Sequence, residues 1–294
     1  MDRHEQLLRD ESDELRSLEE RARSTRALYE HWERNHWSTL AIDYATDAAS
    51  FAALDTESRE GMIWIFAHRF HAEFNVATLL APFLLAAPDY EMQLLLATQV
   101  SDEHRHLQSV LRVYAEVFGI EGGIDAVRAL ADRNVDLVAT TLYDALERSV
   151  SRLSKNSGED DFLRAVVVYH LIAEGVIART AQNLAVGQYE RYGEFPGLIE
   201  GQRLVARDEA RHIGIGVSYA RRRMADDREH AAAVIGEVMG EFAGLATSLL
   251  EAAIAGGMHA QVVAGYGVEP EGFYAEAMRL LQVRLRSIGM LERN

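Results

Sequence analysis

The sequence predicts an all-α protein, a four-helix bundle with additional flanking helices. Apolar residues recur at helical spacing along most of the 294-residue chain, among many Ala, Leu, Glu and Arg residues that favour helix. The four prolines stand at or near predicted helix ends, and no stretch shows the alternating apolar and polar pattern of a strand. Because 48% of the residues are hydrophobic, the chain can bury a sizeable core.

One domain spanning residues 1–294 is the economical prediction, because no Pro/Ser-rich linker and no low-complexity segment interrupts the chain. We expect an N-terminal helical arm within residues 1–36, formed by a charged helix over 5–34. An irregular stretch over 35–54 follows, and Asp55 or Thr56 caps the next helix. The bundle occupies residues 56–226 and further helices occupy 228–294. The predicted helices span 56–86, 89–118, 123–154, 159–190, 196–226, 228–256 and 270–290, with a break at 156–158.

Composition narrows the function classes. The formal net charge of −16 opposes nucleic-acid binding, because phosphates require a basic surface, and it disfavours binding to a membrane surface. The chain has no cysteine, so any metal must be bound by His, Asp and Glu. The polar, acidic N-terminus does not resemble a secretory signal, and the longest apolar run, over 74–88, is too short to cross a bilayer. We therefore expect a cytoplasmic protein.

A short motif occurs twice in the chain. Two copies of Asp-Glu-x-Arg-His stand at 102–106 and 208–212. The ligand-type glutamate of each copy follows another glutamate with apolar neighbours, by thirty residues in the first case and by thirty-five in the second. These upstream glutamates are Glu73 and Glu174. Each separation corresponds to part of one long helix, a turn and part of the next.

The acids of this pattern fall on apolar helix faces. In one predicted helix, the seam that contains Val100 and Leu107 also contains Glu103, with His106 beside it at i+3. The same arrangement recurs on three further predicted helices. Four carboxylates and two imidazoles are therefore expected to point inward from four helices.

Inward carboxylates are unfavourable unless cations accompany them, because buried unpaired charges repel one another or take up protons. A Glu from each of two helices, combined with Glu-x-x-His from the other two, is a known way to bind two metal ions inside a bundle. A single Glu-x-x-His is common on solvated helix surfaces, but two copies on apolar seams favour a two-metal site. The predicted ligands are Glu73, Glu103, His106, Glu174, Glu209 and His212.

Three further residues are candidates for supporting these ligands. Asp102 and Asp208 precede the two motif glutamates, and either can accept the second N–H of a ligand histidine from a neighbouring helix. The alternative is ordinary surface charge. His170 lies one turn before Glu174 and is either an extra ligand or a core histidine beside the ligands, and we favour the second interpretation.

At these residues the sequence resembles the ribonucleotide reductase small subunits and, more closely, their offshoot, the ligand-binding heterodinuclear oxidases. The resemblance extends from about Trp37 to Asp226 and includes Ile42-Asp43 and the segment Tyr-His-Leu-Ile-Ala-Glu-Gly over 169–175. It implies a ferritin-like fold and a homodimer. It also implies that the six predicted ligands hold an Fe/Fe or Mn/Fe pair, which in that oxidase group activates O₂ beside a bound long-chain lipid.

Some positions depart from the family pattern. Reductase subunits that store a tyrosyl radical carry the tyrosine one turn after the first ligand histidine, where this chain has Val110, and its C-terminus does not resemble the tail that docks the reductase large subunit. The oxidase group crosslinks a tyrosine, matched here by Tyr169, to a valine whose place is taken by Asn75, with Val76 next to it. Tyr169 is a candidate for a redox role, and a purely structural buried tyrosine is the alternative.

These observations predict an O₂-dependent di-metal oxidoreductase of the oxidase or monooxygenase type. It would hydroxylate, desaturate, N-oxygenate or cleave a small organic substrate and take electrons from an external donor. A reductase-type radical generator and an iron-storage or structural bundle are the alternatives. Both Fe/Fe and Mn/Fe pairs fit the predicted site, because both metals accept oxygen and imidazole ligands.

Overall fold

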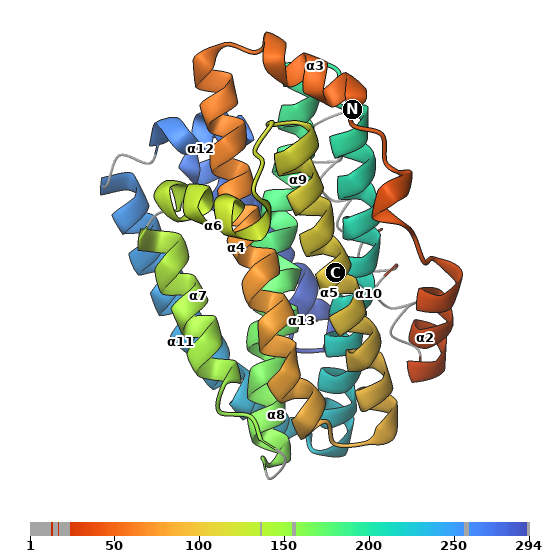
Figure 1. Cartoon of the computed structure of the whole chain (residues 1–294). Coiled ribbons are helices and arrows are strands. Elements are labelled where there is room, and N and C mark those ends of the chain that lie inside the picture. The colour runs from red at the N-terminus through yellow and green to blue at the C-terminus, as the bar shows by residue number, and fades with distance from the viewer. Residues whose placement is uncertain are drawn as a thin grey trace.

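A computed structural model describes residues 13, 17, 24–135, 137–154, 157–255 and 259–292. Within these residues all regular structure is helical, which confirms the predicted all-α class (Figure 1). The helices are α2 (Thr25–Arg34), η1 (Thr39–Ala41), α3 (Ala45–Ala53), α4 (Thr56–Ala86), α5 (Tyr90–Glu116), α6 (Gly123–Asn134), α7 (Leu137–Val150), α8 (Glu159–Val166), η2 (Val167–Ala178), α9 (Arg179–Tyr192), α10 (Pro196–Asp226), α11 (Arg228–Ala255), α12 (His259–Tyr266) and α13 (Pro270–Ser287).

Four long rods form the bundle, and Figure 1 shows them running along a common direction. They are α4, α5, α10 and the continuous rod made by α8, η2 and α9. Helix α4 packs mainly against α5, and α10 packs mainly against η2. Helix α2 lies against α5 and α10, and α13 lies against η2 and α9. None of the helices in the described ranges is long and apolar enough to span a membrane.

Local capping explains where the bundle helices begin. Asp55 accepts a hydrogen bond from the backbone N–H of Ser58 at 2.8 Å, which confirms Asp55 as the cap of α4. Helix α10 begins with Pro196 at its first turn, and its next two backbone N–H groups donate to the buried carboxylate of Asp47 at 3.0 and 2.7 Å. The predicted limits of both helices, 56–86 and 196–226, are confirmed.

Four predictions about the helices are wrong or incomplete. The arm helix is not continuous over 5–34, because Ser24 is extended and its hydroxyl caps α2 from outside. The stretch over 35–54 is not irregular throughout, since it contains η1 and α3. The helix predicted over 123–154 is interrupted at Val135, whose backbone is extended. The region after residue 228 holds a further helix, α12, before α13. The single-domain organisation stays a prediction.

The segment over 159–190 was predicted as one regular helix. Its central part, Val167–Ala178, is instead a π-helix. A π-helix widens each turn and shifts the faces on which side chains lie, and it is frequent at functional sites. Arg284 on α13 is buried and donates from Nε to the carbonyl of Gly175 at 2.7 Å. A Cβ at Gly175 would lie only 3.0 Å from that Nε, so a glycine leaves room for the contact.

A polar layer separates two apolar cores inside the bundle. One core contains Leu96 of α5 and Ile213 of α10, and the other contains Leu107 and Val205 of the same two helices. The Asp-Glu-x-Arg-His copies stand between these positions on both helices. The packing of the bundle therefore encloses their polar side chains between two layers that exclude water.

Candidate metal centre

The six predicted ligands come together in this polar layer, and their relative exposures are 5% or less. Glu73 comes from α4, Glu174 from η2, and each Glu-x-x-His pair from α5 or α10. Their ligand-type atoms form two overlapping groups, and within each group the atoms lie within 4.8 Å of one another. The first group is Glu73, Glu103, His106 and Glu209, and the second is Glu103, Glu174, Glu209 and His212.

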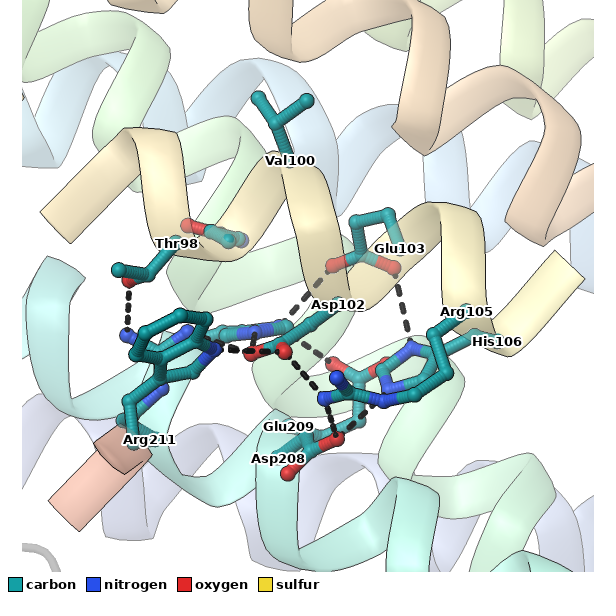
Figure 2. A network of polar contacts seen from close by, with 12 residues as sticks. Thr98, Val100, Asp102, Glu103, Arg105, His106, Asp208, Glu209 and Arg211 are labelled. Atoms are coloured by element: carbon teal, nitrogen blue, oxygen red, sulfur yellow. Dashed lines mark hydrogen bonds and ion pairs between the residues drawn. The ribbon is translucent and has the colours of Figure 1, made fainter. Parts of the chain in front are cut away.

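Glu103 lies between the two imidazoles (Figure 2). Its Oε2 is 3.2 Å from Nδ1 of His106, and its Oε1 is 2.9 Å from Nδ1 of His212. Glu209 contacts the same two imidazoles. Its Oε1 lies 3.6 Å from Nδ1 of His106, and its Oε2 lies 3.6 Å from Nδ1 of His212. Two carboxylates shared by two imidazoles are the arrangement that bridging ligands of a metal pair require.

Each histidine is held from behind by the aspartate of the other motif copy. Nε2 of His106 on α5 is 3.2 Å from Asp208 on α10, and Nε2 of His212 on α10 is 3.2 Å from Asp102 on α5. In the neutral imidazole, an aspartate at Nε2 keeps the N–H on that nitrogen, so Nδ1, which faces the cluster, is the nitrogen that would bind a metal ion. Asp102 and Asp208 thus lie beside the two histidines, and their role in supporting metal ligands stays a prediction.

The aspartates have further partners that sequence reasoning missed. Trp32 donates from its indole to Asp102 at 2.9 Å, and Trp37 donates to Asp208 at 2.7 Å. Arg105 contacts both carboxylates, as Figure 2 shows. Both tryptophans lie in or directly after α2, so the N-terminal segment covers the rear of the centre.

Electrostatics differ between the ligands and the aspartates behind them. Burial raises the pKa of Asp102, but its hydrogen bond with His212 and the nearby positive charges outweigh burial, and the pKa lies below its ordinary value. Asp208 behaves in the same way through His106. Burial, followed by the charge of Glu209, raises the pKa of Glu174 well above its ordinary value. Without a cation, the ligand cluster therefore takes up protons.

The side chains present fit a pair of divalent cations. Oε2 of Glu174 is buried without a hydrogen-bond partner, and Oε1 of Glu103 and Oε2 of Glu209 have only ion-pair contacts with Nδ1 of His212. Unpartnered buried acceptors are unfavourable, and they converge here on one point of the fold. Hard carboxylate oxygens and one imidazole for each ion are the donor set that iron and manganese accept. Metal binding by these six residues stays a prediction, and the geometry agrees with it.

Glu174 has a neutral partner from α5. Gln99 is fully buried and donates from Nε2 to Oε1 of Glu174 at 2.8 Å, while its own Oε1 is 3.0 Å from Nε2 of His170. His170 thus lies behind Gln99 and belongs to neither ligand group, and its interpretation as a core histidine beside the ligands stays a prediction. Sequence reasoning missed Gln99, although a glutamine one turn before Glu103 on an apolar seam was a signal.

Tyr169 is fully buried, and its hydroxyl donates to the backbone carbonyl of Val76 at 3.3 Å. Burial, reinforced by the carboxylates of the cluster, raises its pKa well above the ordinary value, so the phenol keeps its proton. The side chain of Asn75 donates to the carbonyl of His71 at 2.8 Å. Val110 is buried in an apolar core. A redox role for Tyr169 stays a prediction.

No family model matches the sequence. Solved structures of R2-like ligand-binding oxidase resemble the chain at 22% identity, with 90% of this chain and 93% of theirs covered. One is a variant with an anaerobically reconstituted Mn/Fe cofactor, at a TM-score of 0.76. A variant with an aerobically reconstituted Mn/Fe cofactor and a protein with an aerobically reconstituted metal cofactor after photoconversion both reach 0.77. The chain therefore has the predicted all-α fold, a ferritin-like helical bundle that it shares with these solved structures.

Proposed function

We propose that this chain is a di-metal oxidase or oxygenase that activates O₂ and oxidises a small organic substrate, with electrons from an external donor. One observation carries the proposal: four buried carboxylates and two imidazoles converge within two overlapping ligand groups. The shared fold with oxidases that carry a Mn/Fe cofactor supports it.

The two groups indicate how the residues would divide between two ions. Glu103 and Glu209 belong to both groups and would be shared, whereas Glu73 with His106 and Glu174 with His212 would each serve one ion. Such a pair, when bound in its reduced form, would supply the electrons that O₂ activation requires. The chain contributes fixed imidazole tautomers through its two aspartates and apolar layers that exclude water.

The surroundings of the centre favour an oxidase over a subunit that stores a tyrosyl radical. Val110, a buried valine, occupies the place of the radical-storing tyrosine of reductase subunits. The phenol of Tyr169 donates its hydrogen bond to the backbone carbonyl of Val76 and not to a ligand atom. Oxidising equivalents are therefore expected to reach a substrate and not to be kept on a tyrosine near His106.

Oxygen consumption by metal-loaded protein tests the proposal. Protein loaded anaerobically with Fe(II), or with Mn(II) and Fe(II), should consume O₂ on mixing, and stopped-flow absorbance should show a transient visible band. Spin resonance should show no lasting tyrosyl signal. Glu103→Ala, which removes a shared ligand, should consume O₂ no faster than free metal in buffer. A persistent tyrosyl radical would favour the reductase-type function, and O₂ uptake by wild-type protein no faster than free metal would refute the proposal.

Products then define the reaction. Incubation with ¹⁸O₂ and a panel of small organic compounds, followed by mass spectrometry, distinguishes the possible outcomes. Incorporated ¹⁸O in a product with an intact carbon skeleton indicates hydroxylation or N-oxygenation, whereas smaller products indicate cleavage. Loss of two hydrogens without ¹⁸O indicates desaturation. The Glu103→Ala variant under the same conditions is the control for oxidation by free metal.

A further inference from the structure

Gln99 is the neutral partner of the one ligand that lies on the π-helix. It is fully buried on α5, one turn before Glu103. Its amide joins Glu174 and His170, at 2.8 and 3.0 Å, although both of these residues belong to η2. Glu174 therefore has one oxygen engaged by Gln99, while its Oε2 is buried and has no hydrogen-bond partner.

The orientation of this chain of groups follows from what each can donate. A carboxylate that binds metal only accepts hydrogen bonds, so the amide nitrogen of Gln99 must face Glu174 and the amide oxygen must face His170. His170 must then carry its proton on Nε2, so its Nδ1 is unprotonated. This Nδ1 is buried and has no hydrogen-bond partner. Burial lowers the pKa of His170 to about 3, so the ring is neutral and carries a single proton.

The side chain of His170 is closely packed on two sides. Gly216 of α10 lies directly against it, and a Cβ at position 216 would collide with the Cβ of His170. The ring of Phe83 contacts the imidazole edge to face, with centroids 5.5 Å apart. The imidazole is thus confined between α10 and α4, and its Nε2 points at Gln99.

We propose that Gln99, with its amide orientation fixed by His170, is a positioning residue that holds one oxygen of Glu174 and so presents this carboxylate to the metal pair in one orientation. The inference rests on the proposed metal centre. Glu174 depends on such a partner, because its carboxylate is buried and it lacks the charged neighbours of two other ligand glutamates. Glu103 lies 3.2 and 2.9 Å from the two imidazoles, and Glu73 has Arg69 at 3.6 Å.

Titration with Mn(II) tests this inference without O₂ or substrate. Free Mn(II) is followed by spin resonance while the metal-free protein is titrated. Gln99→Leu and His170→Phe should each weaken the binding of one of the two ions about 10- to 100-fold, the usual effect of removing a group that orients a ligand. His170→Gln should bind close to wild-type, because its amide nitrogen can replace Nε2 as the donor to Gln99.

A second pair of variants tests the packing around His170 without changing His170 or Gln99. Gly216→Ala should displace His170 and weaken the same ion, although residue 216 has no polar side chain. Gly187→Ala is the matched control, because Gly187 is also helical and a Cβ there would meet nothing within 4 Å. Thermal melts of the metal-free variants identify any that fail to fold, and the comparison of His170→Phe with His170→Gln then decides.

The outcomes separate this inference from the proposed function. Unchanged Mn(II) affinity in Gln99→Leu and His170→Phe would overturn the positioning role. An equal loss in His170→Phe and His170→Gln would also overturn it, because packing alone would then explain the effect. Wild-type protein that binds Mn(II) but consumes no O₂ when loaded with iron would refute only the proposed function. Wild-type protein that binds no Mn(II) would refute both.

Discussion

The two copies of Asp-Glu-x-Arg-His are nearly identical in sequence but not in their surroundings. Their aspartates and histidines form the same crossed contacts, whereas their arginines differ. Arg211 is buried and contacts Asp102 at 2.6 Å and Thr98 at 2.9 Å. Arg105 is 10% exposed and contacts both Asp102 and Asp208. Asp102 therefore has two guanidinium partners, and Asp208 has one.

Because of this difference, the repeated motif would give unequal support to the two ions of the proposed centre. Behind His212 lies a buried arginine, Arg211, which forms an ion pair with one carboxylate, that of Asp102. The group behind His106 is closed by Arg105, which is partly open to solvent and lies over the ring of Trp37 at 5.1 Å. We expect perturbations on the Asp102 side to cost more than the matching perturbations on the Asp208 side.

Exchanging the aspartates for asparagine should have the largest effect. Asp102→Asn leaves Arg211 as a buried charge without a counter-charge and should lower the free energy of unfolding by about 3–5 kcal/mol, the usual result of breaking a buried ion pair. Asp208→Asn should lower it by less, because Arg105 keeps Asp102 as a partner. Urea unfolding of both metal-free variants measures the difference. A greater loss in Asp208→Asn would contradict the unequal support.

Replacing the arginines should give smaller losses of stability but distinct effects on metal binding. Arg211→Met and Arg105→Met each remove hydrogen bonds to a buried carboxylate, worth about 1.5–3 kcal/mol. Arg211→Met should weaken one ion only, since Arg211 contacts only Asp102 of the two aspartates. Arg105→Met should weaken both ions. Calorimetric titration with Mn(II) resolves the two steps, and equal weakening of both ions by Arg211→Met would show that the copies are not independent.

Metal binding should change how the stability of the protein depends on pH. Burial lowers the pKa of both ligand histidines, but the carboxylates around them outweigh burial and raise it well above the ordinary value of 6.5. A group with a raised folded pKa stabilises the protein fully below its unfolded pKa and loses that contribution as the pH rises. Metal-free protein should therefore lose stability above about pH 6.5, whereas the stabilisation by metal should grow with pH, because binding releases these protons.

Melting curves of metal-free and metal-loaded protein between pH 6 and pH 9 test this change. The melting temperature of metal-free protein should fall across the range, and the difference between loaded and metal-free protein should widen. Wild-type protein with parallel curves in both states would show that the cluster holds no protons for metal to displace. The Glu103→Ala variant is the control for unspecific metal binding.

Much of the centre could be predicted because its ligands repeat locally. Glu-x-x-His places two ligands on one helix face, and the aspartate before each glutamate indicated a crossed partner, as found for Asp102 and Asp208. Trp32 and Trp37 could not be predicted, because they contact their aspartates across 70 and 171 residues and no local pattern encodes such contacts. The tertiary fold alone brings them there.

The fold was predictable where strong caps bound a periodic segment, as Asp55 does for α4. Prediction failed where a single residue interrupts an otherwise helical pattern, as Ser24 and Val135 do. The π-helix over 167–178 was also missed. Its residues are mostly apolar, so their periodicity does not distinguish a widened turn from a regular one, and the contact of Arg284 with Gly175 that accompanies it comes from a distant helix.

Metal content measures the central claim most directly. Metal-free protein incubated with Mn(II) and Fe(II) without O₂, desalted and analysed by inductively coupled plasma mass spectrometry, should retain two metal ions per chain. Glu103→Ala, which lacks a carboxylate shared by both ligand groups, should retain fewer than two. Two ions per chain in the wild type and a loss in the variant are the result that the structure predicts. Fewer than two ions in the wild type, or unchanged content in Glu103→Ala, would contradict a two-metal centre at these residues.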